Sequence, residues 1–240
     1  MIRRPAHKTE AVDWPAHFAK QAERSRSSAV RRFFETGVPA PDTPLRDTPL
    51  AALDFETTGL DPRRHAIVSV GVLPFTLDRI RPHGGQYWVV KPPRPLTRQS
   101  VTFHRLTHAE TQQAPDLGEI LDDLLATLAG RVVVVHYRNI ERPFLFEAIR
   151  ARLGDEVVFP VIDTMEIEAR YHRESRWAKL KQLVGRRPAS IRLADSRTRY
   201  GLPPYQPHHA LVDAWATAEL LQAQVARHYS PETPVGDLWR

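Results

Sequence analysis

The stretch LAALDFETTGL, residues 50–60, most constrains the fold, because it runs a short apolar segment directly into two acidic residues. Such a segment is typical of a β-strand, whose side chains alternate between two faces. Asp54 and Glu56 would then share one face, about 6.6 Å apart along the strand. Placing two carboxylates on an otherwise apolar strand costs free energy unless a cation lies between them. The stretch therefore predicts a metal ion beside a strand.

The order of strand and helix signals predicts the fold class. Three strand signals, at residues 50–56, 66–77 and 86–92, are joined by short connections, which favours an antiparallel meander. Helix and strand signals then alternate, with helices at 116–130, 141–154 and 210–229 and strands at 131–137 and 157–164. We therefore predict an α/β protein whose mixed central sheet, an antiparallel meander followed by parallel strands, is flanked by helices.

The chain divides into three parts by composition. Residues 1–45 form an N-terminal extension, with helical spacing over 16–34 and a proline-punctuated linker that begins at residue 40. Residues 46–228 form the main domain, and residues 229–240 form a short C-terminal tail. The N-terminal extension could dock on a partner or pack on the core, and the sequence leaves both open.

Composition and charge narrow the functional classes. The chain has 240 residues and no cysteine, which excludes disulfides and cysteine-ligated zinc and fits a cytoplasmic protein. No signal peptide or membrane span is apparent, so no membrane partner is expected. Residues 171–200 hold nine Lys and Arg against two Asp and Glu, a net charge of +7. The whole chain has a net charge of +6, so the other residues sum to −1. A lone basic stretch is commonly a solvated surface, but beside acidic metal ligands it favours a polyanionic substrate.

Two further acidic residues lie where they could join Asp54 and Glu56. Glu141 follows the buried strand RVVVVHY, and Asp213 lies in the last helix, five residues after His208. On one helix, five residues turn about 500°, which would leave the side chains of His208 and Asp213 about 140° apart. Pro207 indicates that the helix starts there, so His208 belongs to the loop or the first turn.

Three motifs together carry a family resemblance. DFETTG at 54–59, HYRNIERPFL at 136–145 and HHALVD at 208–213 resemble, in order and spacing, the exonuclease motifs of DnaQ-like 3′–5′ exonucleases. These are DEDD nucleases of the histidine subtype, on an RNase H-like fold, and they include the proofreading epsilon subunit of DNA polymerase III. The resemblance covers about residues 48–226 and leaves out the first 45.

The resemblance implies a role for each motif residue. It implies two Mg²⁺ or Mn²⁺ ions bridged by Asp54, with Glu56 and Asp213 completing their ligand shells and His208 as general base. It also implies that Thr57, Thr58 and Gly59 meet the 3′-terminal sugar, that Leu60 is an apolar wedge under the last base, and that His104 lies near the terminal nucleotide. By contrast, His136 is expected to be a packed, hydrogen-bonded residue, His209 a neighbour of the catalytic position, and Asp163 a helix cap.

Glu141 departs from the family pattern, which usually has aspartate at this position. The extra methylene is either absorbed by the site, with Glu141 among the catalytic residues, or it displaces an ion and activity is lost.

The sequence therefore predicts a metal-dependent 3′–5′ exonuclease that releases nucleoside monophosphates from single-stranded or frayed DNA ends. An exoribonuclease of the same fold and a nucleic-acid-binding protein with a decayed site are the alternatives. The expected partner is a single-stranded 3′ end, with a DNA polymerase or repair complex as a candidate assembly.

Overall fold

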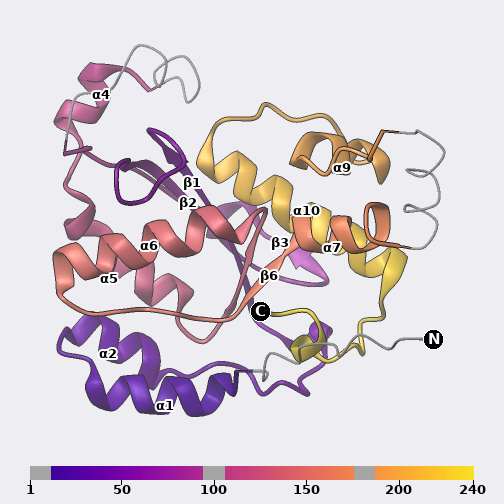
Figure 1. Ribbon diagram of the computed structural model, residues 1–240, viewed down its shortest axis with the longest axis horizontal. Coiled ribbons are helices and arrows are strands. Elements are labelled where there is room, and N and C mark those ends of the chain that lie inside the picture. The colour runs from indigo at the N-terminus through magenta and orange to yellow at the C-terminus, as the bar shows by residue number, and fades with distance from the viewer. Residues whose placement is uncertain (1–11, 94–105, 176–186) are drawn as a thin grey trace, which may run out of the picture.

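The computed structural model describes residues 12–93, 106–175 and 187–240 (Figure 1). A six-stranded sheet runs in the order β3-β2-β1-β5-β6, and β4 also pairs with β2. Its strands are β1 (Leu50–Thr57), β2 (Ile67–Thr76), β3 (Arg79–Ile80), β4 (Gln86–Val89), β5 (Val132–Val135) and β6 (Val161–Asp163). Strand β2 is antiparallel to β1, β3 and β4, whereas β5 is parallel to both β1 and β6. The mixed sheet predicted from the sequence is confirmed.

The helices surround this sheet. They are α4 (His108–Gln113), α5 (Leu117–Leu128), α6 (Arg138–Leu153), α7 (Thr164–His172), α9 (Leu193–Arg199) and α10 (Ala210–His228), with short 3₁₀ turns η1 (Leu45–Asp47), η2 (Pro82–Gly84) and η3 (Val235–Asp237). The long helix α10 packs against β1 and β2, the two strands that begin the meander. Within the described ranges, no helix combines the length and apolar character needed to cross a membrane.

The helical spacing over 16–34 does not produce one continuous helix. The structure has α1 (Trp14–Arg24) and α2 (Ser28–Glu35), separated at residues 25–27. The carboxylate of Asp155 accepts hydrogen bonds from the backbone N–H groups of Arg26 and Ser27, the shortest of them 2.6 Å. The break is therefore stabilised by a residue far along the chain, which periodicity in the N-terminal segment does not show.

Both ends of the described chain pack on the sheet domain. Phe18, Phe33 and Phe34 are buried in the same hydrophobic core as the strands, and α2 lies beside α5 (Figure 1). At the other end, Arg240 and Val161 exchange two backbone hydrogen bonds of 2.9 and 3.2 Å, so the tail runs along β6. The N-terminal helices and the tail therefore both contribute contacts to the folded domain.

Candidate active site

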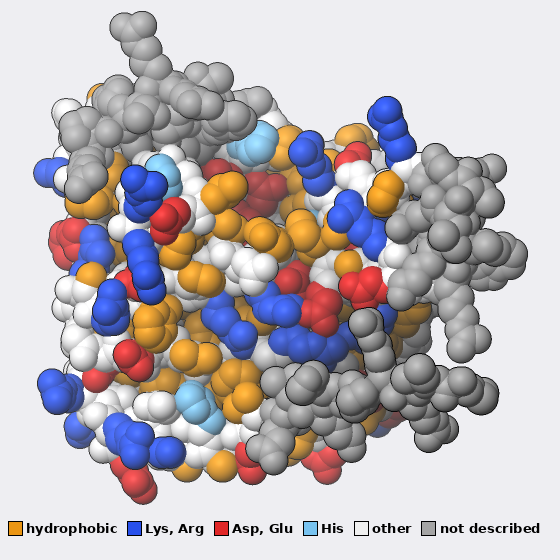
Figure 2. All heavy atoms as spheres, in the orientation of Figure 1, with side chains coloured by type: hydrophobic (Ala, Val, Ile, Leu, Met, Phe, Trp, Pro, Cys, Tyr) orange, Lys and Arg blue, Asp and Glu red, His pale blue; other side chains and the backbone are white. Residues whose placement is uncertain are grey.

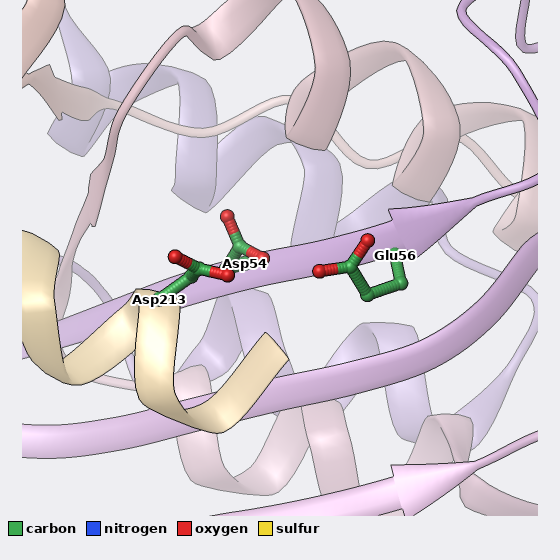
Figure 3. Close-up of side chains that lie close together, drawn as sticks. All are labelled: Asp54, Glu56 and Asp213. Atoms are coloured by element: carbon green, nitrogen blue, oxygen red, sulfur yellow. The ribbon is translucent and has the colours of Figure 1, made fainter. Parts of the chain in front are cut away.

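Three carboxylates converge at one end of the sheet. Asp54 and Glu56 lie on β1, Asp213 lies in the first turn of α10, and one oxygen from each lies within 4.8 Å of the others. Figure 3 shows the three side chains gathered in the space between β1 and the start of α10. The alternation along β1 thus places Asp54 and Glu56 together, as predicted, and the last helix adds the third carboxylate.

A glycine on the neighbouring strand allows α10 to approach. Gly71 is the register partner of Asp54, and a β-carbon on Gly71 would lie 2.2 Å from the backbone carbonyl carbon of Ala210. Real side chains do not tolerate such a distance, so any larger residue would push the start of α10 away. The sequence does not single out Gly71, because only the packing of α10 reveals the role of this glycine.

Asp213 is held by the backbone that precedes its helix. Its Oδ2 accepts the N–H of His208 at 2.8 Å and the N–H of His209 at 3.2 Å. His208 has a φ of 71°, an uncommon left-handed conformation for a residue with a side chain. The two adjacent histidines differ in surroundings, since His208 lines the pocket and the ring of His209 stacks on Tyr87 at 4.2 Å.

Glu141 lies in the first turn of α6 and lines the same pocket, with 3% of its surface exposed. Its Oε2 is buried and has no hydrogen-bond partner in the described part of the chain. It is not one of the three residues whose oxygens lie within 4.8 Å of one another. Glu141 is nevertheless close enough for its charge to raise the pKa of Asp54.

Without a cation, these carboxyl groups are costly to ionise. Burial, followed by the charges of Asp213, Glu141 and Glu56, raises the pKa of Asp54 well above its ordinary range. Burial and the charge of Asp213 raise the pKa of Glu56 to about 8. Across the described ranges, no Lys or Arg forms an ion pair with Asp54, Glu56, Glu141 or Asp213. Hard carboxylate oxygens that lack a cation fit a divalent metal such as Mg²⁺ or Mn²⁺.

The pocket around the carboxylates is about 860 Å³ and is also lined by Thr57, Thr58, Gly59 and Leu60. Figure 2 shows acidic side chains at the base of a hollow, with hydrophobic, histidine and basic side chains around it. Leu60 is 78% exposed, as an apolar wedge for a base would need to be. A β-carbon on Gly59 would lie 2.6 Å from the imidazole of His65, so the ring of His65 packs closely against the backbone of this turn.

The remaining candidates have clear placements. His136 hydrogen-bonds to Thr164 Oγ1 at 2.8 Å and to the carbonyl oxygen of Ile191 at 3.0 Å, and burial lowers its pKa to about 4. It is the packed histidine that the sequence predicted. Asp163 caps α7, as expected, and also accepts the N–H of Tyr137 at 3.0 Å at the start of α6. His104 lies outside the described residues.

Two tyrosines also line the pocket. Tyr137 lines the pocket immediately before α6. It is 41% exposed and has a φ of 99°. Tyr205 lines the pocket from the loop before α10, where burial and then the charge of Asp213 raise the pKa of its hydroxyl. Tyr137 lies within the motif at 136–145 but was assigned no role there, and Tyr205 lies outside the three motifs.

Comparison with known proteins identifies the family. The exonuclease family model, RNase_T, matches residues 51–221. The chain therefore belongs to this exonuclease family, as a DnaQ-like 3′–5′ exonuclease. It is 30% identical over 185 residues to the DNA polymerase III PolC-type of Thermotoga maritima, which covers 75% of this chain. It is also 30% identical over 195 residues to a DNA polymerase III subunit epsilon-like protein of Rhodobacter capsulatus, which covers 78% of this chain. The chain spans 12% and 25% of the lengths of these two relatives.

Solved structures support the fold. The nuclease domain of 3′hExo, a DEDDh family member bound to rAMP, has a TM-score of 0.62 at 14% identity, over 79% of this chain and 96% of that domain. Exonuclease X in complex with 5′ overhanging duplex DNA has a TM-score of 0.56 at 21% identity, over 79% of this chain and 98% of its own. These similarities and the observed sheet confirm the predicted RNase H-like fold.

Proposed function

We propose that this protein is a metal-dependent 3′–5′ exonuclease that releases nucleoside monophosphates from single-stranded or frayed DNA ends by two-metal-ion hydrolysis. The observation that carries the proposal is the group of carboxylates Asp54, Glu56 and Asp213, which lack a compensating cation among the described residues and share a pocket with His208. Bound divalent ions would supply charge neutralisation at the scissile phosphate and at the leaving oxygen.

The chain's own residues divide the remaining work. Asp54, Glu56 and Asp213 would hold the ions, and Glu141 would complete the acidic set. His208, exposed at the pocket wall, would accept the proton of the attacking water, since histidine is the side chain most often used as a general base. Thr57, Thr58, Gly59 and Leu60 would receive the terminal nucleotide.

DNA is the favoured substrate because the relatives at 30% identity are named for DNA polymerase III. An exoribonuclease is the second candidate, since the similar structures include one bound to rAMP and a 3′-exonuclease that recognises a histone mRNA stem-loop. A decayed, purely binding site is less well supported, because the acidic side chains and His208 all line one pocket.

The proposed domain division follows the sequence boundaries, with the exonuclease domain at 46–228, the helical extension before it and the tail after it. The names of the relatives favour a DNA polymerase or repair complex as partner, and the lack of cysteine favours a cytoplasmic location.

Digestion of 5′-labelled oligonucleotides tests the proposal. The full chain is incubated with matched DNA and RNA strands, with Mg²⁺, with Mn²⁺ or with chelator. Progressive shortening of DNA that chelator abolishes is the expected result, and faster shortening of RNA would establish the exoribonuclease instead. Asp54→Asn, which removes one carboxylate charge, should abolish shortening. Strands that are bound but remain intact in every metal would overturn the enzymatic proposal.

A further inference from the structure

Tyr137 is one of the few large apolar side chains that the fold leaves exposed. Within the described ranges, three such side chains are exposed, those of Val12, Leu60 and Tyr137, with exposed fractions of 53%, 78% and 41%. Leu60 and Tyr137 both line the pocket that holds the carboxylates. Ligand pockets are typically lined by apolar and aromatic side chains beside a few polar groups. The pocket therefore offers two exposed apolar surfaces in addition to its carboxylates.

These two side chains come from the same end of the sheet. Strands β1 and β5 are parallel neighbours, and Leu60 and Tyr137 each follow the carboxyl end of one of these strands. In open α/β sheets, ligands bind beyond the carboxyl ends of the parallel strands. The topology thus places both side chains at the end of the sheet where a ligand is expected.

The backbone of Tyr137 has a conformation that tyrosine rarely adopts. Its φ is 99°, in the left-handed region that favours glycine and asparagine. The buried carboxylate of Asp163 holds it there, because Oδ1 accepts the N–H of Tyr137 and Oδ2 accepts the N–H of Arg138, each at 3.0 Å. These hydrogen bonds use only the backbone, and the side chain of Tyr137 does not cap α6. Glycine or asparagine would begin α6 with less strain, so the fold alone does not explain a tyrosine here.

An exposed aromatic ring in a pocket for nucleic acid can stack on a base. Such stacking tolerates any sequence because every base has a π face, which suits an enzyme that removes successive nucleotides. We propose that Tyr137 is a substrate-binding residue whose ring stacks on the 3′-terminal nucleobase. The proposal rests on the proposed function, because it requires the pocket to receive the end of a nucleic acid strand.

Tyr137→Asn is the informative variant, because asparagine tolerates the left-handed backbone and removes the ring. Tyr137→Phe is the matched control, because it keeps the ring and removes only the hydroxyl. The probes are two 5′-labelled single strands of DNA, identical except that the 3′-terminal nucleotide of one lacks its base. Fluorescence anisotropy measures the affinity of the full chain for each strand in Ca²⁺, which takes oxygen ligands as Mg²⁺ does, and gel electrophoresis verifies that the strands stay intact.

Tyr137→Asn should bind the complete strand about 5- to 100-fold more weakly than wild type, the loss typical of removing one aromatic stacking partner. Its affinity for the abasic strand should match that of wild type, and Tyr137→Phe should bind both strands as wild type does. The melting temperature of Tyr137→Asn without DNA should equal or exceed that of wild type, because the backbone strain is relieved.

Wild-type affinity of Tyr137→Asn for the complete strand would overturn the proposal, and so would an equal loss of affinity for both strands. A wild-type chain that binds neither strand would overturn the proposed function and this proposal together. If the wild-type chain binds the strands but shortens no oligonucleotide in Mg²⁺, the nuclease proposal fails. A loss of affinity in Tyr137→Asn that is confined to the complete strand would then still support the stacking role.

Discussion

Gly71 and Asp54 are register partners on adjacent strands, and the absent side chain of Gly71 leaves the space that the backbone of Ala210 fills. The start of α10 therefore lies directly over the strand pair that carries Asp54. Because Asp213 follows Ala210 within one helical turn, this contact sets the distance between the carboxylates of β1 and the carboxylate of α10.

Gly71→Ala should therefore displace α10 and impair the site. The added methyl group, 2.2 Å from the Ala210 carbonyl carbon, cannot be accommodated without a backbone shift. We expect a loss of about 1–3 kcal/mol in the free energy of unfolding and about 10²-fold in exonuclease rate. Gly84→Ala is the control, since its β-carbon would meet only the Pro74 carbonyl oxygen at 3.8 Å. A Gly71→Ala protein with the wild-type exonuclease rate would show that the contact between Gly71 and Ala210 does not determine the geometry of the site.

His208 and His209 are adjacent in sequence and should differ greatly in importance. His208→Ala should lower turnover by about 10²–10⁴ through loss of the general base, while Mn²⁺ affinity stays nearly unchanged. His209→Ala should matter far less, because this ring stacks on Tyr87 and does not line the pocket. Single-turnover rates on a labelled oligonucleotide measure both effects. Equal losses of turnover in the two variants would contradict the assignment of His208 as the general base.

Much of the sheet could be predicted because its signals are local. Short connections specify the antiparallel meander, and the apolar run that becomes β5 specifies a strand buried on both faces. The helical spacing over 16–34 did not show the break between α1 and α2, because that break depends on Asp155, which accepts the N–H groups of Arg26 and Ser27 from far along the chain. No periodicity within residues 16–34 contains that information.

In the active site, too, some features could be predicted from local sequence signals and others depend on nonlocal contacts. Asp54 and Glu56 could be paired from strand alternation alone, whereas the approach of Asp213 required the family resemblance and, physically, the space above Gly71. The place of Tyr205 in the pocket could not be predicted, because it depends on a loop that packs on Arg197. Contacts made by loops depend on the assembled fold, and a single sequence carries little trace of them.

The metal-free protein should lose stability as pH rises. Burial and the charge of Asp213 raise the pKa of Glu56 from its ordinary value of 4.5 to about 8. The folded state therefore binds a proton that the unfolded state releases between these values, so this contribution is fully present below pH 4.5 and is lost as pH rises through about 8. Thermal melting in chelator from pH 5 to pH 8.5 measures the decline.

Divalent cations should reverse this decline, because they stabilise the ionised carboxylates that high pH produces. Glu56→Gln, which cannot ionise at this position, should flatten the dependence of the melting temperature on pH in chelator. A metal-free wild type whose melting temperature does not change between pH 5 and pH 8.5 would contradict the expected protonation of Glu56.

Basic residues beside the pocket should guide the strand. Arg192 is exposed and lines the pocket, and Arg187 is exposed nearby in sequence, whereas Arg186 lies outside the described residues. Replacing all three with Gln should weaken oligonucleotide binding. The slope of the logarithm of the binding constant against the logarithm of salt concentration should become less steep by about 0.7 for each lost phosphate contact. Fluorescence anisotropy at several salt concentrations gives both values. A double replacement of Arg79 and Arg81, which border a separate pocket, is the control. An unchanged salt slope would make the segment an ordinary solvated surface.

Glu141 is expected to be a working substitute for the aspartate usual in the family. It lies at the motif spacing after β5, in the first turn of α6, and Phe144 and Leu145 pack that helix into the core. A longer side chain can reach the site through rotamer choice, although ion placement tolerates little error. Glu141→Ala should lose most activity, and Glu141→Asp should keep a measurable fraction of it. A Glu141→Ala enzyme as fast as wild type would remove this carboxylate from the site.

The stability of Glu141→Gln separates a functional carboxylate from a merely structural one. The Oε2 of Glu141 is buried without a hydrogen-bond partner in the described ranges, and burial raises the pKa of this carboxyl well above its ordinary range. In chelator, the free energy of unfolding of Glu141→Gln should increasingly exceed that of wild type as pH rises, since only the wild-type carboxyl must either ionise without a partner or hold a proton that the unfolded chain releases. The same change should lower exonuclease rate in Mg²⁺. Glu147→Gln on the same helix, which removes an ion pair with Arg150 outside the pocket, should do neither. A protein that becomes more stable and less active indicates a group retained for catalysis at a cost in stability, whereas a Glu141→Gln protein that is both less stable and fully active would show that this carboxylate serves the fold alone.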